Sequence, residues 1–287
     1  DFQGMAVCGG FSYGDVLGAG GGWSKTILYN NLVKDQFQEF FSDEKVFTLG
    51  VCNGCQMLSN LKDIIPGAEF WPSFERNLSD QFEARLAQVK ISKTESVLLD
   101  GMEDWIIPVA SAHGEGRAQF NNNDLEELEK ENQIAMHFVD SSENSTEIYP
   151  INPNGSPNGI TGITASNGRV TIMMPHPERV FRKVQLSWHR KDWNEYSPWM
   201  QIFINAKKFR VINAPKIVKS LSSLSFSGLN SLFIGESKNF EIWPKDFPVS
   251  MGRWSWSSGF ADLNNDGWED LVVSNGYITG WREKPDL

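Results

Sequence analysis

Cysteine and long apolar runs are scarce in this sequence. Three cysteines in 287 residues are too few for a disulfide framework. The sequence has no apolar run of the length needed to span a membrane, and it does not open on a signal-peptide pattern. These absences argue against a disulfide-rich secreted domain and a membrane protein, so we expect a cytoplasmic protein.

Basic residues are outnumbered and form no run. The chain has 26 Lys and Arg against 36 Asp and Glu, which gives a net charge of -10. Because binding to phosphate backbones needs a basic patch, we expect no nucleic-acid partner. The hydrophobic content of 40% is sufficient for a packed core, and the length allows one large domain with or without an appendage.

Strand and helix patterns are mixed along the first 212 residues. Runs of apolar and β-branched residues predict strands at 5–10, 45–52, 83–92, 105–111, 134–140 and 169–174. Apolar residues recur at helical spacing from Trp23 to Phe41, which predicts one helical face. Helical spacing is also present at 55–61 and 198–209. This mixture predicts an α/β sheet.

The composition changes after about residue 212. Residues 219–231 are Ser-rich and weakly patterned. We therefore predict two regions, 1–212 and 213–287, of which the second is a poorly structured or partly β tail.

An acidic stretch in the tail, residues 259–276, has the spacing D-x-N-x-D-G-x-x-D and resembles an FG-GAP repeat of extracellular β-propellers. Oxygen ligands at alternate positions of a tight loop can converge on one calcium ion, whereas the alternative is an acidic turn between strands. One such repeat is not expected to fold alone. The candidate calcium-binding residues are Asp262, Asn264, Asp266, Trp268 and Asp270.

Two of the cysteines, Cys52 and Cys55, lie three residues apart in the stretch GVCNGC. Both could be small buried hydrophobic residues, or they could form a redox pair between a strand and a helix. A structural zinc site usually needs a second pair of ligands, and the remaining cysteine is the single Cys8. The fourth interpretation uses Cys52 alone, as a nucleophile.

The nucleophile interpretation depends on the glycines that flank Cys52. The pattern G-x-C-x-G, with Gly50 and Gly54, is typical of a sharp strand-to-helix turn that lifts the side chain clear of the sheet. The N-terminus of the following helix would favour the thiolate, and the Asn53 amide could face a developing oxyanion.

A thiol nucleophile needs a base and a group that orients the base. His176 follows an apolar strand that Pro175 ends, and Glu178 comes two residues later. His137 lies in a strand-like run and His189 among aromatic residues, so they are weaker candidates. The residues alone therefore favour a Cys, His, Glu order.

Seven stretches carry a resemblance to a known family. They are CGGFSYGDVLGAGGGWSKTILYN, GVCNGCQMLSNL, RNLSDQFEAR, SAHGEGR, YPINPNGSPNGITG, MMPHPERVFR and SPWMQIFINA. Over about residues 1–212 the chain resembles the class I glutamine amidotransferases, and among them the C-terminal glutaminase domains of the phosphoribosylformylglycinamidine synthase family. The resemblance implies a flavodoxin-like α/β sheet that here lacks its first strand and helix, which would precede Asp1.

The resemblance also implies roles for individual residues. Cys52 would attack the glutamine carboxamide, His176 would transfer protons and Glu178 would orient His176. The implied oxyanion hole consists of Gly10, Phe11 and Asn53. The implied glutamine pocket contains Gln56, His113 and Gly114.

In the resembling family the ammonia is used by a synthetase region that binds ATP and magnesium and is absent from this chain. The resemblance therefore implies glutamine as substrate, the synthetase region as partner, and no cofactor for the glutaminase step. It implies ammonia supply for making formylglycinamidine ribonucleotide in purine biosynthesis. A calcium-binding fragment without catalytic activity and a thiol redox protein remain the alternatives.

Overall fold

The computed structural model describes residues 3–11, 14–121 and 123–213, and four strands at 233–236, 239–242, 255–261 and 270–275. The chain divides into two compact units, residues 1–219 and 220–287. No helix among the described residues has both the length and the apolar character needed to cross a lipid bilayer.

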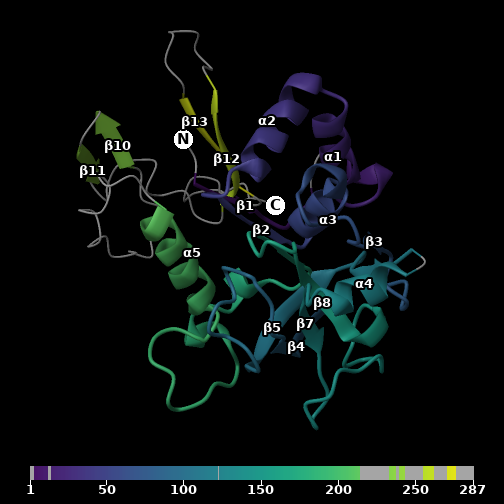
Figure 1. The fold of residues 1–287 in the computed structure, drawn as a ribbon. Helices are drawn as coiled ribbons and strands as arrows, with labels where there is room; N and C mark the ends of the chain where they lie inside the picture. Colours follow the sequence, from purple (N-terminus) through teal and green to yellow (C-terminus); the bar gives the residue numbers. More distant parts are fainter. Residues whose placement is uncertain are drawn as a thin grey trace, which may run out of the picture. The chain divides into compact units, whose positions relative to one another are not determined.

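A mixed seven-stranded sheet forms the centre of the first unit (Figure 1). Its strands, in spatial order, are β1 (Gly4–Val7), β2 (Phe47–Val51), β9 (Val170–Met173), β8 (Ile160–Thr164), β7 (Ile134–Phe138), β4 (Glu83–Ile91) and β5 (Ile106–His113). The pairs β1–β2 and β2–β9 are parallel, whereas the pairs from β9 to β5 are antiparallel. A separate antiparallel pair joins β3 (Ser73–Glu75) to β6 (Arg117–Gln119). The predicted α/β class is confirmed.

In the described part of the first unit, five α-helices accompany the sheet. They are α1 (Gly21–Leu28), α2 (Asn31–Ser42), α3 (Asn53–Ser59), α4 (Asp124–Lys130) and α5 (Met200–Asn213). Short 3-10 helices lie at Asp15–Leu17, Lys62–Ile64, Pro157–Gly159, Pro177–Arg179 and Lys183–Gln185. Helix α3 contacts β2 and β9, and α1 contacts both α2 and α3, so these three helices form one group (Figure 1).

The prediction of a single helical face from Trp23 to Phe41 is wrong. The segment is two helices, because Asn30 has extended backbone dihedral angles and its side chain accepts a hydrogen bond from the Val33 N–H at 3.3 Å. This N-cap restarts the helix, and the positions before and after it no longer share a face. Leu32 is consequently 70% exposed, whereas Ile27 and Phe41 are buried.

Strand β8 has no counterpart among the predicted strands. Its sequence ITGIT interrupts the apolar residues with threonines and a glycine, yet all five residues are buried. The hydroxyl of Thr164 donates a hydrogen bond to the Val170 carbonyl at 3.1 Å. Polar residues can be buried in a strand when they find hydrogen-bond partners inside the sheet. The strand therefore has no continuous apolar run, and its sequence did not predict it.

The sheet curls so that its last strand meets the chain that follows β9. The His176 N–H donates a hydrogen bond to the Ala110 carbonyl of β5 at 2.7 Å, and the two residues form an isolated β-bridge. Trp199 supports the same strand, because its indole N–H donates to the Pro108 carbonyl at 2.7 Å. Residues of β5 thereby reach the carboxyl ends of β2 and β9.

The described residues of the second unit form two antiparallel strand pairs, β10 (Phe233–Glu236) with β11 (Asn239–Ile242) and β12 (Ser255–Ala261) with β13 (Asp270–Asn275). Strand β13 agrees with the expected partly β tail. Four of the candidate calcium residues, Asp262, Asn264, Asp266 and Trp268, lie outside the described residues. Asp270 begins β13, and the calcium site stays a prediction.

Candidate active site

Cys52 occupies a strained turn between β2 and α3. Its dihedral angles are φ 54 and ψ -112, which a residue with a Cβ rarely adopts. The Cys52 N–H donates to the Met173 carbonyl at 2.9 Å, and its carbonyl accepts from the Gln56 N–H at 3.0 Å. The backbone is thus held by β9 on one side and by α3 on the other. The predicted strand, turn and helix are confirmed.

The flanking glycines leave no space for side chains. A Cβ on Gly50 would lie 2.5 Å from Leu58 Cδ1 and 2.9 Å from the Gly54 carbonyl oxygen. A Cβ on Gly54 would lie 2.6 Å from the Val7 carbonyl carbon and closer still to its oxygen. The G-x-C-x-G spacing therefore follows from close contact between α3, β2 and β1.

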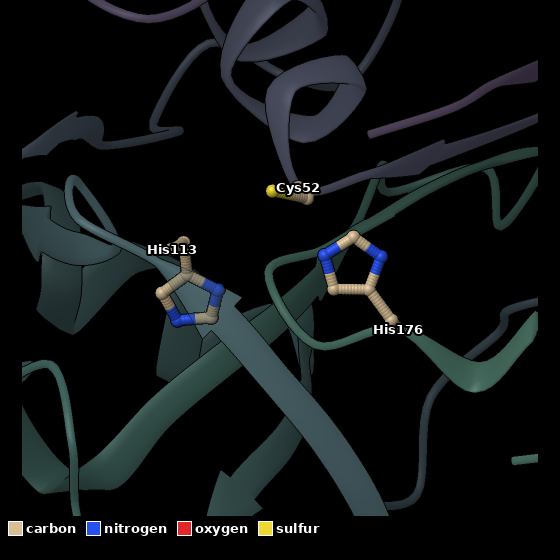
Figure 2. A group of neighbouring side chains, drawn as sticks. All are labelled: Cys52, His113 and His176. Carbon is tan, nitrogen blue, oxygen red and sulfur yellow. The ribbon is translucent and has the colours of Figure 1, made fainter. Parts of the chain in front are cut away.

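His176 lies on the loop after β9 and is 1% exposed. Its Nδ1 is 2.6 Å from Glu178 Oε1. Its Nε2 is buried and faces Cys52 (Figure 2). The two residues that the sequence paired, His176 and Glu178, are therefore in contact, and the other ring nitrogen is directed at the cysteine.

A second imidazole, that of His113, lies beside Cys52 (Figure 2). His113 ends β5 and is 3% exposed, and its Nε2 is 2.7 Å from Asn154 Oδ1. The Asn154 amide group donates to the Gly116 carbonyl at 2.8 Å, which orients Oδ1 toward the ring. Nε2 of His113 therefore carries a proton, and its buried Nδ1 is the ring nitrogen left for Cys52.

The resemblance placed His113 in the glutamine pocket, but the structure also puts it next to the cysteine. The Cys52 sulfur and one nitrogen from each histidine all lie within 4.8 Å of one another. Sequence spacing gives no signal for this contact, because His113 reaches the site only through the curl of the sheet.

The two histidines change the acidity of Cys52. Burial disfavours the thiolate, but hydrogen bonds from His113 and His176 and their charges outweigh burial and lower the pKa of Cys52 to about 6. Burial also disfavours a charged His176, but hydrogen bonds to Cys52 and Glu178 with their charges raise its pKa to about 9. Near neutral pH this arrangement favours a thiolate beside an imidazolium.

The loop after β1 lies against this pair. A Cβ on Gly9 would be 2.6 Å from His176 Cε1 and 2.9 Å from Cys52 Cβ. The Asn53 side-chain amide donates to the Gly10 carbonyl at 2.6 Å and to Asp15 Oδ2 at 3.0 Å.

Of the predicted oxyanion residues, Gly10 and Asn53 are thus in direct contact, and Asn53 opens α3, where backbone N–H groups lack helical partners. The side chain of the third, Phe11, is 85% exposed.

The residues expected in the glutamine pocket converge on one segment, 113–116. Gln56, buried in α3, donates a hydrogen bond from its side chain to the Glu115 carbonyl. The Gly114 carbonyl accepts from the Asn77 N–H at 2.9 Å. The Glu115 carboxylate accepts from the Ala19 N–H at 2.9 Å, which links the segment to the glycine-rich loop.

Cys55 has a different environment from Cys52. It lies inside α3, fully buried, and burial raises its pKa well above the usual thiol value, with a smaller contribution from Cys52. A thiol of this kind is a poor nucleophile and a poor redox partner. The difference between the two cysteines favours the interpretation in which Cys52 acts alone.

Several residues at the site were not identified from the sequence, among them Gly9, Asp15 and Asn154. Asn154 lies in the stretch YPINPNG, which contributed to the family resemblance but has no spacing that indicates a contact with His113. Its position depends on a buried network in which the Asn152 carboxamide oxygen accepts from the Asn154 N–H at 3.2 Å.

A family model described as the CobB/CobQ-like glutamine amidotransferase domain matches residues 1–210. The chain belongs to this family. The match covers most of the chain and includes every residue named above at the site. The expected class I glutamine amidotransferase relationship is confirmed at the level of the family.

Solved structures match the chain over about three quarters of its length. A chain of PurLQS from Thermotoga maritima has a TM-score of 0.52 and 20% identity, and the match covers 73% of this chain and 80% of that chain. A glutamine amidotransferase from the same organism has a TM-score of 0.35 and 14% identity, over 74% of this chain and 64% of that chain. The PurLQS match supports the α/β fold described above.

Proposed function

We propose that the chain hydrolyses glutamine to glutamate and ammonia, with Cys52 as nucleophile, His176 as general acid and base, and Glu178 as the group that orients His176. The observation that carries this proposal is the strained turn that places Cys52 beside the buried Nε2 of His176, while Glu178 holds Nδ1. Membership of a glutamine amidotransferase family supports glutamine as substrate.

In the first half of the reaction, the Cys52 thiolate attacks the side-chain carbonyl carbon of glutamine, and the carbonyl electron pair moves to oxygen. The tetrahedral intermediate then collapses as its C–N bond breaks. His176 gives its Nε2 proton to the leaving nitrogen, which departs as ammonia. The product is a γ-glutamyl thioester on Cys52.

In the second half, a water molecule attacks the thioester carbonyl while His176 accepts one water proton on Nε2. The C–S bond breaks, glutamate leaves, and the thiolate and imidazolium are restored. Glu178 accepts the Nδ1–H bond throughout and so keeps Nε2 directed at the reacting atoms. No cofactor takes part in this scheme.

The developing oxyanion needs N–H donors close to the Cys52 sulfur. We assign this role to the amides of Asn53 and of Gly10 or Phe11. The contact between the Asn53 side chain and the Gly10 carbonyl supports the assignment, because it ties the two backbone segments together beside Cys52. Gln56, His113 and Gly114 are assigned to the glutamine pocket.

The sequence resemblance further supports a role in purine biosynthesis. In this proposal the ammonia passes to a separate synthetase region that converts formylglycinamide ribonucleotide to formylglycinamidine ribonucleotide, with ATP and magnesium bound there.

The test compares two variants of the neighbouring cysteines, Cys52→Ala and Cys55→Ser, in an assay of glutamate release from glutamine. Removing the nucleophile should lower the rate by roughly 10⁵-fold or more. Cys55→Ser should keep most of the rate, because this thiol is buried in α3 and does not face the reaction.

Equal losses in the two variants, with both proteins folded by circular dichroism, would contradict the assignment of Cys52. A reversible disulfide between the cysteines without glutamine turnover would favour the redox alternative. Folding that depends on calcium, again without turnover, would favour the calcium-binding alternative.

A further inference from the structure

The three side chains around the Cys52 sulfur have the composition of a metal site. Cys52 Sγ, a nitrogen of His113 and a nitrogen of His176 lie within 4.8 Å of one another, and all three residues are buried (Figure 2). Thiolate and imidazole are ligands that zinc and other soft divalent metals prefer. Catalytic zinc sites commonly combine three such ligands with one open position.

Both histidines already have the outer partners that a metal-binding imidazole needs. Such a ring usually donates its second N–H to a carboxylate or carbonyl oxygen, which fixes the tautomer and the ring orientation. Glu178 Oε1 meets Nδ1 of His176 at 2.6 Å, and Asn154 Oδ1 meets Nε2 of His113 at 2.7 Å.

The second nitrogen of each ring, the one that does not contact Glu178 or Asn154, is directed at the sulfur. Nε2 of His176 and Nδ1 of His113 are buried, and the partner that both rings share is the Cys52 sulfur. Two buried ring nitrogens that share one thiolate place three ligand atoms around a single position.

The separations suit a tetrahedral ion after a small movement. Zinc bonds of about 2.0–2.1 Å to nitrogen and about 2.3 Å to sulfur place the ligands of one ion about 3.3–3.6 Å apart. Since no pair here exceeds 4.8 Å, each separation needs to shrink by about 1.5 Å or less.

We propose that Cys52, His113 and His176 form a binding site for zinc, with the fourth position open to water, and that zinc bound there blocks the thiolate. Binding places the sulfur lone pair and both nitrogen lone pairs on the metal and releases to solvent the proton held by His176. The binding itself does not depend on the reaction proposed above, whereas the inhibition rests on that proposed function.

The test uses cobalt(II) as a spectroscopic substitute for zinc, added to the full chain reduced with a phosphine that does not bind metals. Cobalt bound to a thiolate gives a sulfur-to-metal charge-transfer band in the near ultraviolet, and four-coordination gives intense d–d bands in the visible. We expect one cobalt per chain with both features, and displacement of cobalt by zinc. Zinc should also suppress glutamate release, and a chelator should restore it.

Matched variants locate the metal. Cys52→Ser should abolish the charge-transfer band, and His113→Gln should weaken cobalt binding by about tenfold or more. Three controls should keep the band, namely Cys8→Ser, Cys55→Ser and His137→Gln. His137 contacts the Asn158 carbonyl and is not part of the cluster. Circular dichroism checks that each variant is folded.

The outcomes separate the two proposals. A folded wild-type chain that gives no charge-transfer band, or a band unchanged in Cys52→Ser, would overturn the zinc site. Glutamine turnover that zinc does not inhibit would overturn the blocking of the thiolate. Cobalt binding with the expected band but no glutamine turnover under any condition would support the metal site and contradict the proposed function instead.

Discussion

The two ring nitrogens of His176 have different partners. Nδ1 contacts Glu178 at 2.6 Å, so the ring can exchange a proton only through Nε2, on the side of Cys52. The pKa is about 6 for Cys52 and about 9 for His176. Between these two pH values Cys52 is mostly a thiolate and His176 mostly an imidazolium. Within that range the thiolate and the imidazolium stabilise each other, which is the state needed to attack a carboxamide.

The low pKa of Cys52 predicts how its alkylation depends on pH. The thiolate reacts with iodoacetamide and the thiol does not, so the rate should rise through pH 6 and be nearly constant above about pH 7. An ordinary thiol, with a pKa of about 8.5, would gain about tenfold per pH unit over the same range. Mass spectrometry of the Cys52 peptide, in the presence of a chelator, measures the rate.

Cys8 is an internal control for this experiment. Cys8 is exposed, but partial desolvation of its thiol, with a smaller contribution from the charge of Glu178, raises its pKa, so its alkylation should still be increasing at pH 9. A Cys52 rate that climbs in parallel with that of Cys8 would show that Cys52 is an ordinary thiol.

At the scale of elements, the site depends on how closely α3 approaches β1. Gly54 in α3 faces the Val7 carbonyl, and a Cβ would overlap backbone atoms that cannot rotate away. This contact sets the depth at which α3 lies on the sheet and hence the position of Cys52 at its start.

Gly54→Ala should therefore push α3 away from β1. We expect a loss of about 1–3 kcal/mol in the free energy of unfolding, as for other overpacked core positions, together with a lower rate of glutamate release. The midpoint of chemical denaturation measures the stability.

Gly114→Ala is the matched control for stability. A Cβ there would meet no atom closer than Phe82 Cδ2 at 3.9 Å, and the residue does not have a left-handed φ. Its denaturation midpoint should stay close to that of the wild type. If Gly54→Ala were as stable as Gly114→Ala, the contact between α3 and β1 would not exclude a side chain at position 54, and the prediction for Gly54→Ala would be wrong.

At the scale of the whole molecule, the first unit contains the seven-stranded sheet and all the residues proposed for the reaction. The family match ends at residue 210, close to the predicted boundary after residue 212. Helix α5 contains the buried residue Ile202 and ends at Asn213, one residue beyond the predicted boundary.

A chain that stops after Ile212 should therefore keep its core. We expect its melting temperature to fall by less than about 3 °C, which corresponds to about 1 kcal/mol or less for a domain of this size. Thermal unfolding and limited proteolysis of both chains, with and without calcium, measure the effect.

A fall of more than about 6 °C on truncation would show that the second unit stabilises the first. A large rise in melting temperature with calcium, seen in the full chain and absent from the truncated one, would place a stabilising ion in the tail. Either result would contradict a boundary after residue 212.

The sequence by itself determined the features that depend on neighbours along the chain. Gly50, Cys52 and Gly54 predicted the turn between β2 and α3, because a sharp strand-to-helix connection needs small residues at those two positions. His176 and Glu178 are two residues apart, and their contact is local. The α/β class followed from the periods of the apolar residues.

Only the tertiary structure decided which distant residues meet. The His113 ring reaches Cys52 because the sheet curls until β5 bridges to His176, and no local pattern records that curvature. Asn154 in turn fixes the His113 tautomer from a loop 41 residues away in the chain. Spacing along a chain specifies the turn that presents a thiol, whereas packing between strands selects the imidazoles around it.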